Sequence, residues 1–320
     1  MMGTVSLEVR NLKKYFNTPR GLLHAVDNVD FSIEAGKTLG VVGESGCGKS
    51  TLGRVILHLL ESTGGQILFE GKDVTHVSRA QLRALREDMQ IIFQDPYSSL
   101  NPRMSVSEII MEPLFLKGGM SRADMYRETK RLMDTVGLAE RLENAYPHEL
   151  DGGRRQRIGI ARALALNPKF IVCDEPVSAL DVSIQAQVLN LMLDLQEERK
   201  LTYIFITHDL SVVKYFSDDI MVMYLGQVVE KAPSDLLFAN PGHPYTKALL
   251  SAIPVPDVHA PRERILLKGE ITSPINPKPG CRFAARCPHA VEACTKEQKL
   301  AKVNEDHYVA CHRAEELMDK

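Results

Sequence analysis

The sequence predicts an α/β fold with a mixed sheet core, an antiparallel β subdomain, a helical insertion and a small irregular C-terminal extension. The first 35 residues alternate apolar and polar side chains, as half-buried antiparallel strands do. Residues 38–42 are an apolar run that leads into a glycine-rich stretch and then a helical pattern over residues 50–60. Residues 170–173 and 203–206 are apolar on both faces, which is typical of central parallel strands covered by helices.

Other stretches complete the predicted order of elements. Strand character occurs at residues 66–69, 89–93, 220–224 and 227–230, and helical patterns occur at residues 105–166 and 184–198. From Asn240 onward the chain is punctuated by proline. We therefore expect two domains, residues 1–240 and residues 241–320, with a helical subdomain within the first at about residues 95–166.

Composition narrows the class of protein. The chain has 320 residues, of which 44% are hydrophobic and 25% are charged, which excludes disordered, collagen-like and coiled-coil classes. Because the chain has 39 basic and 41 acidic residues, it has no net positive charge that would attract nucleic acid. The sequence also lacks both an apolar run of about 18 residues and the layout of a signal peptide. We expect a cytoplasmic protein whose contact with any membrane is peripheral.

The clearest motif lies at residues 43–51, which match G-x-x-x-x-G-K-[ST] at every fixed position. The glycines let backbone N–H groups converge on a phosphate, Lys49 reaches the β and γ oxygens, and Ser50 offers a hydroxyl to Mg²⁺. The alternative, a glycine turn that precedes a helix by chance, is disfavoured by the strand and helix on either side. The predicted ATP-binding residues here are Gly43, Ser45, Gly46, Cys47, Gly48, Lys49, Ser50 and Thr51.

A second motif places two acids at the end of an apolar strand. Asp174 and Glu175 follow residues 170–173. In phosphoryl transfer, an aspartate in this position holds Mg²⁺ and a neighbouring acid can polarise the attacking water. The alternative is a helix N-cap, which the phosphate loop upstream disfavours. We assign Asp174 to Mg²⁺ and Glu175 to the general base.

Six segments together resemble an ABC-type ATPase domain in their order and spacing, over residues 5–240. The tail, at residues 242–250, 276–283 and 286–288, resembles the extension of oligopeptide/dipeptide importer ATPase subunits. The six segments are the phosphate loop, residues 92–96, residues 149–157, residues 174–176, residues 178–181 and residues 206–209.

The resemblance implies roles for further residues. Gln94 corresponds to the loop glutamine that senses Mg²⁺ and the γ-phosphate, and His208 to the switch histidine that holds Glu175 in place. Asp181 is expected at a dimer interface. Phe16, with Tyr15 as the alternative, resembles the aromatic that stacks on adenine, although a core aromatic would also suit that position.

The signature loop, residues 150–154, departs from the family. The usual Leu-Ser-Gly-Gly-Gln is here Leu-Asp-Gly-Gly-Arg, so Asp151 replaces the serine beside Gly152 and Gly153. In such dimers this loop closes over the ATP of the other subunit, where a carboxylate would repel the γ-phosphate by about 4 kcal/mol at 4 Å and an effective dielectric of about 20. Arg154 would offset part of this repulsion. We expect an asymmetric dimer in which the site served by Asp151 is impaired.

Four cysteines, Cys281, Cys287, Cys294 and Cys311, lie in the last 40 residues. Their spacing lacks the tight pairs of structural zinc sites and suits a four-cysteine iron–sulfur cluster. The resemblance points to a four-iron four-sulfur cluster, while zinc and free thiols remain alternatives. Cys47 and Cys173 are interpreted as small packing residues.

The resemblance implies the ATP-hydrolysing subunit of a membrane importer for dipeptides or oligopeptides, bound to the cytoplasmic face of the membrane. The implied cofactors are ATP and Mg²⁺. The implied partners are a second, non-identical ABC ATPase subunit, two transmembrane permease subunits and, through the complex, an extracytoplasmic peptide-binding protein. Residues 97–103 are expected to face the permeases. Alternatives are another cargo, such as nickel or an oligosaccharide, and a nucleic-acid repair ATPase, which the charge and the absence of a long coiled-coil insertion disfavour.

Overall fold

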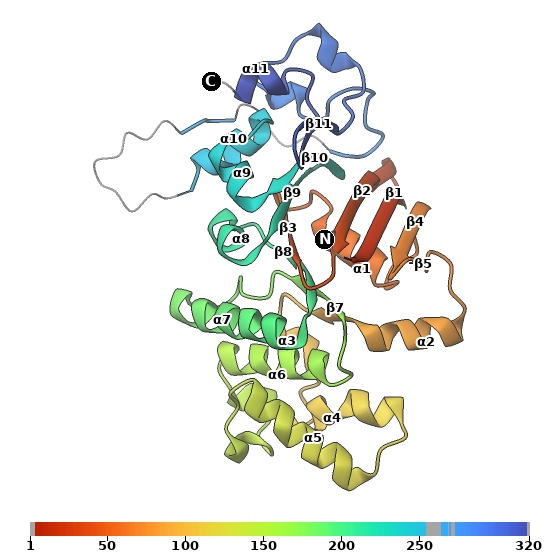
Figure 1. Cartoon of the computed structure of the whole chain (residues 1–320), viewed down its shortest axis with the longest axis vertical. Helices are drawn as coiled ribbons and strands as arrows, with labels where there is room; N and C mark the ends of the chain where they lie inside the picture. Colours follow the sequence, from red (N-terminus) through yellow and green to blue (C-terminus); the bar gives the residue numbers. More distant parts are fainter. Residues whose placement is uncertain (1–3, 254–263, 268, 270–272, 319–320) are drawn as a thin grey trace. The chain divides into compact units, whose positions relative to one another are not determined.

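The computed structural model describes residues 4–253, 264–267, 269 and 273–318. The chain forms two compact units, one made of Met1–His76 with Phe205–Lys320 and the other of Val77–Ile204. Figure 1 colours the elements in chain order, so the first unit holds the red strands and the blue tail, and the second holds the yellow and green helices. The described part of residues 241–320 belongs to the first unit, and the domain boundary near residue 240 stays a prediction.

The first unit contains an antiparallel sheet with the strand order β2-β1-β4-β5. The alternation at the start of the sequence is confirmed, because Leu7 and Val9 are buried opposite Ile33 and Phe31. Beyond the middle of the strands, Phe16 pairs with Leu23 near the turn. The strands are β1 (Val5–Thr18), β2 (Gly21–Glu34), β4 (Gly64–Phe69) and β5 (Lys72–Asp73).

A second set of strands in the first unit runs in the order β11-β12-β10-β9-β3. Strands β3 and β9 are parallel and wholly apolar in the middle, with Val41 opposite Met221. Strand β12 of the tail pairs with β10, so the C-terminal extension enlarges this sheet. The strands are β3 (Thr38–Val42), β9 (Asp219–Tyr224), β10 (Gln227–Pro233), β11 (Ala301–Asn304) and β12 (His307–Val309).

The helices of the first unit are short. Helix α1 begins at Lys49 directly after the glycine loop and ends at Ile56, earlier than the predicted residue 60, because His58 adopts a left-handed φ of 52°. The tail is mostly irregular, as expected, with short turns between its strands. The helices are α1 (Lys49–Ile56), α8 (Leu210–Phe216), α9 (Ser234–Ala239), α10 (Pro244–Ser251), α11 (Ala314–Met318), and the 3₁₀ turns η3 (Ala284–Arg286) and η4 (Glu292–Thr295).

The second unit combines strands β6 (Met89–Ile92) and β7 (Phe170–Asp174), which are parallel, with the start of β8 (Thr202–Ile206) next to β7. All five residues of β7 are buried, as the two-sided apolar pattern predicts. From Pro96 to Leu164, the ordered elements are helices and 3₁₀ turns.

Serines fix where several of these helices begin. Ser78 and Ser105 form capping boxes with Gln81 and Glu108, which satisfy free N–H groups of the first turn. The helices are α2 (Arg79–Asp88), α3 (Pro96–Ser99), α4 (Val106–Lys117), α5 (Arg122–Thr135), α6 (Gly152–Leu164) and α7 (Val182–Arg199), with η1 (Glu140–Leu142) and η2 (Pro147–Glu149) between α5 and α6. No helix in the described ranges is long and apolar enough to span a membrane.

Candidate functional site

The phosphate loop, residues 43–51, joins buried strand β3 to helix α1. Gly48 is the N-cap of α1 with φ 108°, and a Cβ there would lie 2.1 Å from the Ala25 carbonyl oxygen. Only glycine fits this conformation and this close approach. The loop therefore leads into a helix N-terminus, where successive backbone N–H groups are arranged as in sites that bind phosphate.

Lys49 lies within this loop and is only 5% exposed. Its Nζ donates to the carbonyl oxygens of Gly43, at 2.7 Å, and Glu44, at 3.1 Å. Cys47 is buried, and burial raises the pKa of its thiol, so its interpretation as a packing residue is confirmed. A buried ammonium held by loop carbonyls is positioned to meet the negative charge of a phosphate. The remaining predicted loop residues, Ser45, Gly46, Ser50 and Thr51, are exposed or half-buried.

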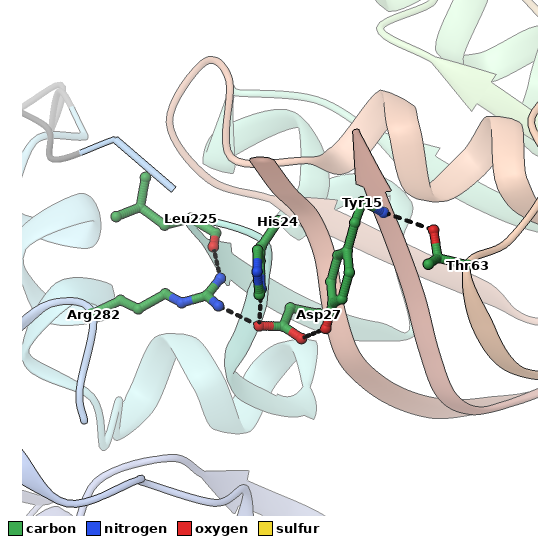
Figure 2. Close-up of polar contacts among 6 residues, drawn as sticks. All are labelled: Tyr15, His24, Asp27, Thr63, Leu225 and Arg282. Atoms are coloured by element: carbon green, nitrogen blue, oxygen red, sulfur yellow. Dashed lines mark hydrogen bonds and ion pairs between the residues drawn. The ribbon is translucent and has the colours of Figure 1, made fainter. Parts of the chain in front are cut away.

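The Phe16 hairpin, formed by the ends of β1 and β2 around their turn, carries the predicted adenine-stacking residue. Tyr15 stacks on His24 with ring centroids 4.0 Å apart, and its hydroxyl donates to Asp27 (Figure 2). Phe16 projects to the opposite side of the strand from Tyr15, because successive side chains alternate. Tyr15 is therefore engaged in a polar network, which favours Phe16 over Tyr15 as the aromatic that stacks on a base.

Asp27 is the centre of that network. Burial tends to raise its pKa, but hydrogen bonds from Tyr15 and His24 and the charge of Arg282 outweigh burial, so the pKa of Asp27 lies below its ordinary value. The pKa of Tyr15 is raised above its ordinary value, chiefly by burial and then by the hydrogen bond to Asp27. At neutral pH, Asp27 is thus an anion and Tyr15 a donor.

The second unit brings together two of the predicted catalytic residues. Asp174 ends strand β7 and is 2% exposed, and Glu175 follows it with a left-handed φ of 48°. This conformation costs a non-glycine residue about 1–3 kcal/mol and is concentrated at functional sites. The Gln94 amide Nε2 donates to Glu175 Oε2 over 2.9 Å. A carboxylate oriented in this way can accept a proton from water.

The signature loop also lies in the second unit, where Asp151 is the N-cap of helix α6. Its carboxylate accepts from the backbone N–H of Arg154 at 2.8 Å, and the Arg154 guanidinium lies 3.2 Å from the other carboxylate oxygen. Asp151 therefore performs the capping that serine would perform. A Cβ on Gly153 would lie 2.6 Å from the Ile184 side chain, and a Cβ on Gly152 would lie 3.0 Å from the Leu180 side chain. Both positions therefore leave little room for a larger residue.

His208 lies in the first unit between β8 and α8 and is exposed. Asp209, the next residue, caps α8 by accepting from the N–H of Ser211 at 2.8 Å. The exposed Asp181 is the N-cap of α7 in the second unit, beside Val182, whose 82% exposure is the largest among the exposed large hydrophobic residues. Both predicted residues are thus exposed next to the start of a helix, and their roles stay predictions.

The four cysteines of the tail line one small cavity together with His289 and His312. Burial raises the pKa of Cys281 to about 11, and it also raises the pKa of Cys287 and Cys311. Among the residues that the structure describes, however, no group of three or more His, Cys, Asp or Glu side chains is arranged to hold a metal ion. The expected metal-binding character of the extension, with an iron–sulfur cluster or zinc, is therefore not supported.

Sequence reasoning missed a set of contacts from the tail to the nucleotide-binding loops. Arg286 pairs with Glu44 of the phosphate loop, Tyr245 accepts from the Glu44 backbone N–H, and Arg282 pairs with Asp27. The only signal in the sequence was that an arginine stands beside each of Cys281 and Cys287.

Comparisons with known proteins first define the class. Residues 26–178 match the ABC transporter family, and residues 229–294 match the oligopeptide/dipeptide transporter C-terminal region. One similar structure is the ATP-binding cassette MJ0796, solved as a dimer in a post-hydrolysis state bound to ADP and Pi. It is 29% identical with a TM-score of 0.66, and the match covers 71% of this chain and 98% of the MJ0796 chain. CbiO1 from Clostridium perfringens, part of the transporter complex cbiONQ, is similar at 29% identity and TM-score 0.66, covering 74% of this chain and 91% of its own. These matches define an ABC-type ATP-binding cassette.

Full-length relatives define the family within that class. Oligopeptide transport ATP-binding protein AppF of Bacillus subtilis is 52% identical over 318 residues, which cover 96% of each chain. Oligopeptide transport ATP-binding protein OppF of Escherichia coli is 50% identical over 316 residues, covering 98% of this chain and 95% of the relative. The chain therefore belongs to the family of ATP-binding subunits of oligopeptide/dipeptide ABC transporters.

Proposed function

We propose that this chain is the ATP-hydrolysing subunit of a membrane ABC importer for dipeptides and oligopeptides. The observation that carries the ATPase part is the phosphate loop, with the ammonium of Lys49 buried among the loop carbonyls at the start of α1. The cargo rests on relatives named as oligopeptide transport proteins, which match over nearly the full chain.

ATP would bind with its phosphates on the N–H groups of the phosphate loop and its adenine against Phe16. Ser50, Gln94 and Asp174 would hold Mg²⁺, and their oxygen atoms are the donors that this cation prefers. When bound, Mg²⁺ neutralises charge on the phosphate oxygens.

The general base for hydrolysis would be the carboxylate of Glu175, in the second unit. Glu175 takes a proton from a water molecule whose oxygen attacks the γ-phosphorus, and the bond to the bridging oxygen breaks to leave ADP and phosphate. The hydrogen bond from Gln94 keeps the Glu175 carboxylate in one orientation. His208 would steady the same step as the switch histidine.

A second ATPase subunit would complete the assembly. The relative MJ0796 is described as a dimer, and the exposed Val182 beside Asp181 suits burial against a partner. Because Asp151 would bring a carboxylate to the partner's γ-phosphate, we propose that the partner is not identical, so that only one of the two sites is impaired. Gly152 and Gly153 would contact the same phosphate.

Membrane attachment would be peripheral, at the cytoplasmic face, through two permease subunits that also link the complex to an extracytoplasmic peptide-binding protein. Tyr97 on α3 is 57% exposed, and the guanidinium of Arg155 lies 5.0 Å from its ring centre. An exposed aromatic residue beside an arginine is typical of binding hot spots. Nucleic acid is not among the proposed partners.

A four-iron four-sulfur cluster, with zinc as the alternative, is retained as a proposal for the tail because its four thiols line one cavity. Since the described side chains do not form a metal-ligand group, we assign the cluster no step in hydrolysis. Metal and sulfide analysis of the chain purified without oxygen tests it, with about four irons expected. A chain that holds no metal would remove the cluster.

The function is tested by peptide uptake into membrane vesicles that contain the complete transporter. Glu175→Gln should abolish ATP-driven uptake and lower ATP hydrolysis by about 10²- to 10⁴-fold, since the general base is lost. Glu197→Gln, an exposed acid on α7, is the matched control and should leave both unchanged. Uptake of peptide that persists in Glu175→Gln would contradict the proposal.

A further inference from the structure

The C-terminal extension of this chain contacts both loops that the proposed function assigns to ATP. These contacts lie within the first unit. They come from helix α10, from the segment around Asn276, and from two arginines next to the tail cysteines. None of them belongs to the motifs that define an ATP-binding cassette.

The first contact holds the phosphate loop through Glu44. Arg286 donates from Nη1 to Glu44 Oε2 at 2.7 Å and from Nη2 to Oε1 at 3.0 Å, which is a bidentate pair. The Arg286 side chain is 8% exposed and that of Glu44 is 24% exposed. The hydroxyl of Tyr245 accepts from the Glu44 backbone N–H at 2.8 Å. The tail therefore fixes both the side chain and the backbone of the second residue of the loop.

The second contact holds the Phe16 hairpin through Asp27. In Figure 2, the Arg282 guanidinium and the His24 ring both reach the Oδ2 atom of Asp27, while the Tyr15 hydroxyl donates to the Oδ1 atom. Arg282 also donates to the carbonyl oxygen of Leu225. The side chains of Arg282 and Asp27 are 7% and 8% exposed, so water screens this pair weakly. Because Tyr15 precedes Phe16 on β1, the pair limits how β1 can twist at the stacking residue.

The third contact joins the same hairpin to the tail through an isolated antiparallel bridge between Leu23 and Ile275. Pro274 accepts at its carbonyl from the His24 N–H at 3.0 Å, and Asn276 exchanges hydrogen bonds with Leu22 at 2.9 Å and 2.8 Å. Leu23, between them, is the residue that pairs with Phe16. Strand β2 is the edge strand of its sheet. The hydrogen bonds from the tail cover part of this edge and so restrict bending of the hairpin.

We propose that Arg286 and Arg282 are positioning residues that hold the phosphate loop and the Phe16 hairpin in the geometry that ATP requires. ATP affinity in this chain then depends on the C-terminal extension as well as on the nucleotide-binding motifs. The physical basis is preorganisation, because a loop that is already fixed loses less conformational entropy when the ligand binds. The inference rests on the proposed ATP-binding function and adds to it the residues that set affinity.

Equilibrium binding of Mg²⁺ with a fluorescent ATP analogue to the full chain tests the inference. Arg286→Met and Arg282→Met should each weaken binding by about tenfold, which corresponds to about 1.4 kcal/mol. Arg286→Lys should recover part of the loss, because the charge remains while the bidentate geometry is lost. In the complete transporter, KM for ATP should rise more than kcat falls.

Arg313→Met is the matched control. Arg313 is also a tail arginine near the cysteines, but it pairs with Glu316 at 2.8 Å and its hydrogen bonds reach neither nucleotide-binding loop. The affinity of Arg313→Met for the analogue should be within about twofold of the parent's affinity. Thermal unfolding of every variant checks that the chain is folded, and if Arg282→Met does not fold, Arg286→Met decides, since Glu44 is closer to the surface.

Parent affinity in both Arg286→Met and Arg282→Met would overturn the inference and leave the proposed function standing. An equal loss in Arg313→Met would also overturn it, because the effect would then be a general loosening of the tail. A parent chain that binds no ATP analogue would overturn the proposed function and the inference together.

Discussion

The phosphate loop and the signature loop are both rich in glycine, yet their polar side chains are held differently. In the phosphate loop, Lys49 is buried and bonds to carbonyls of its own loop, and Glu44 is fixed by two residues of the tail. In the signature loop, Asp151 and Arg154 pair with each other at the surface, with side chains 58% and 46% exposed. The contacts that hold the phosphate loop therefore all come from this chain, whereas the charges of the signature loop are exposed at its surface.

The largest expected effect comes from the backbone of the phosphate loop. Gly48→Ala should destabilise the fold by about 2–4 kcal/mol and remove ATP binding, because the new Cβ would collide with the Ala25 carbonyl. Gly46→Ala is the matched variant, since a Cβ there meets no atom within 4 Å and costs only the strain of φ 78°, about 1 kcal/mol. Thermal unfolding of both variants measures the difference. Equal destabilisation would break the claim that close packing shapes this loop.

The next effect concerns how the tail supports the same loop at different pH. His243 is fully buried, where burial lowers its pKa to about 4, and its Nδ1 accepts from the N–H of Tyr245 at 3.1 Å. Glu230, which accepts from the backbone N–H of His243 at 2.9 Å, is also buried, as is His307, which contacts Glu230. The unfolded chain takes up a proton on His243 near pH 6.5, whereas the folded chain does so only near pH 4. The free energy of unfolding should therefore decrease as the pH is lowered from 6.5 to 4, by about 3 kcal/mol at most.

His243→Asn sharpens this prediction. An asparagine oxygen can still accept from the Tyr245 N–H but does not titrate. The variant should therefore lose less stability than the parent between pH 6.5 and pH 4 in thermal unfolding. Two curves with the same slope would show that His243 does not cause the pH dependence.

The smallest expected effect tests the signature loop. In the proposed asymmetric dimer, Asp151→Ser should raise the ATPase rate of the assembled complex by up to about twofold, because relief of the repulsion between carboxylate and γ-phosphate, part of which the Arg154 pairing already offsets, restores one impaired site beside one that already works. Serine also caps α6, so the thermal midpoint should change little. An unchanged rate and ATP affinity would mean that the outward-facing charge has no catalytic consequence.

Much of the site could be predicted from the sequence because its residues are fixed by local structure. The phosphate loop follows from a strand, a glycine pattern and a helix start that adjoin in the chain, and Cys47 was correctly interpreted as a packing residue. The family resemblance assigned roles to Gln94 and Glu175 but did not predict the hydrogen bond between them, which joins residues 81 positions apart. The left-handed backbone of Glu175 has no signal in the sequence.

The tail could not be predicted in the same way. Its contacts join residues that are more than 200 positions apart, such as Glu44 with Tyr245 and Arg286, and an arginine carries no information about its partner. The cysteine spacing predicted a metal site, but the described structure gathers the four thiols around a cavity without forming a metal-ligand group. Composition anticipated the irregular chain but not the strands β11 and β12 that attach it to β10.

The most direct measurement is the binding of Mg²⁺ and ATP to the full chain alone, compared between the parent, Lys49→Met and Lys72→Met. Lys72 is an exposed lysine on β5 and serves as the control. If the phosphate loop is complete within one chain, the parent and Lys72→Met bind one ATP with equal affinity and Lys49→Met loses about a hundredfold, because charge-assisted hydrogen bonds to the phosphates are lost. ATP binding at parent affinity in Lys49→Met would contradict the account.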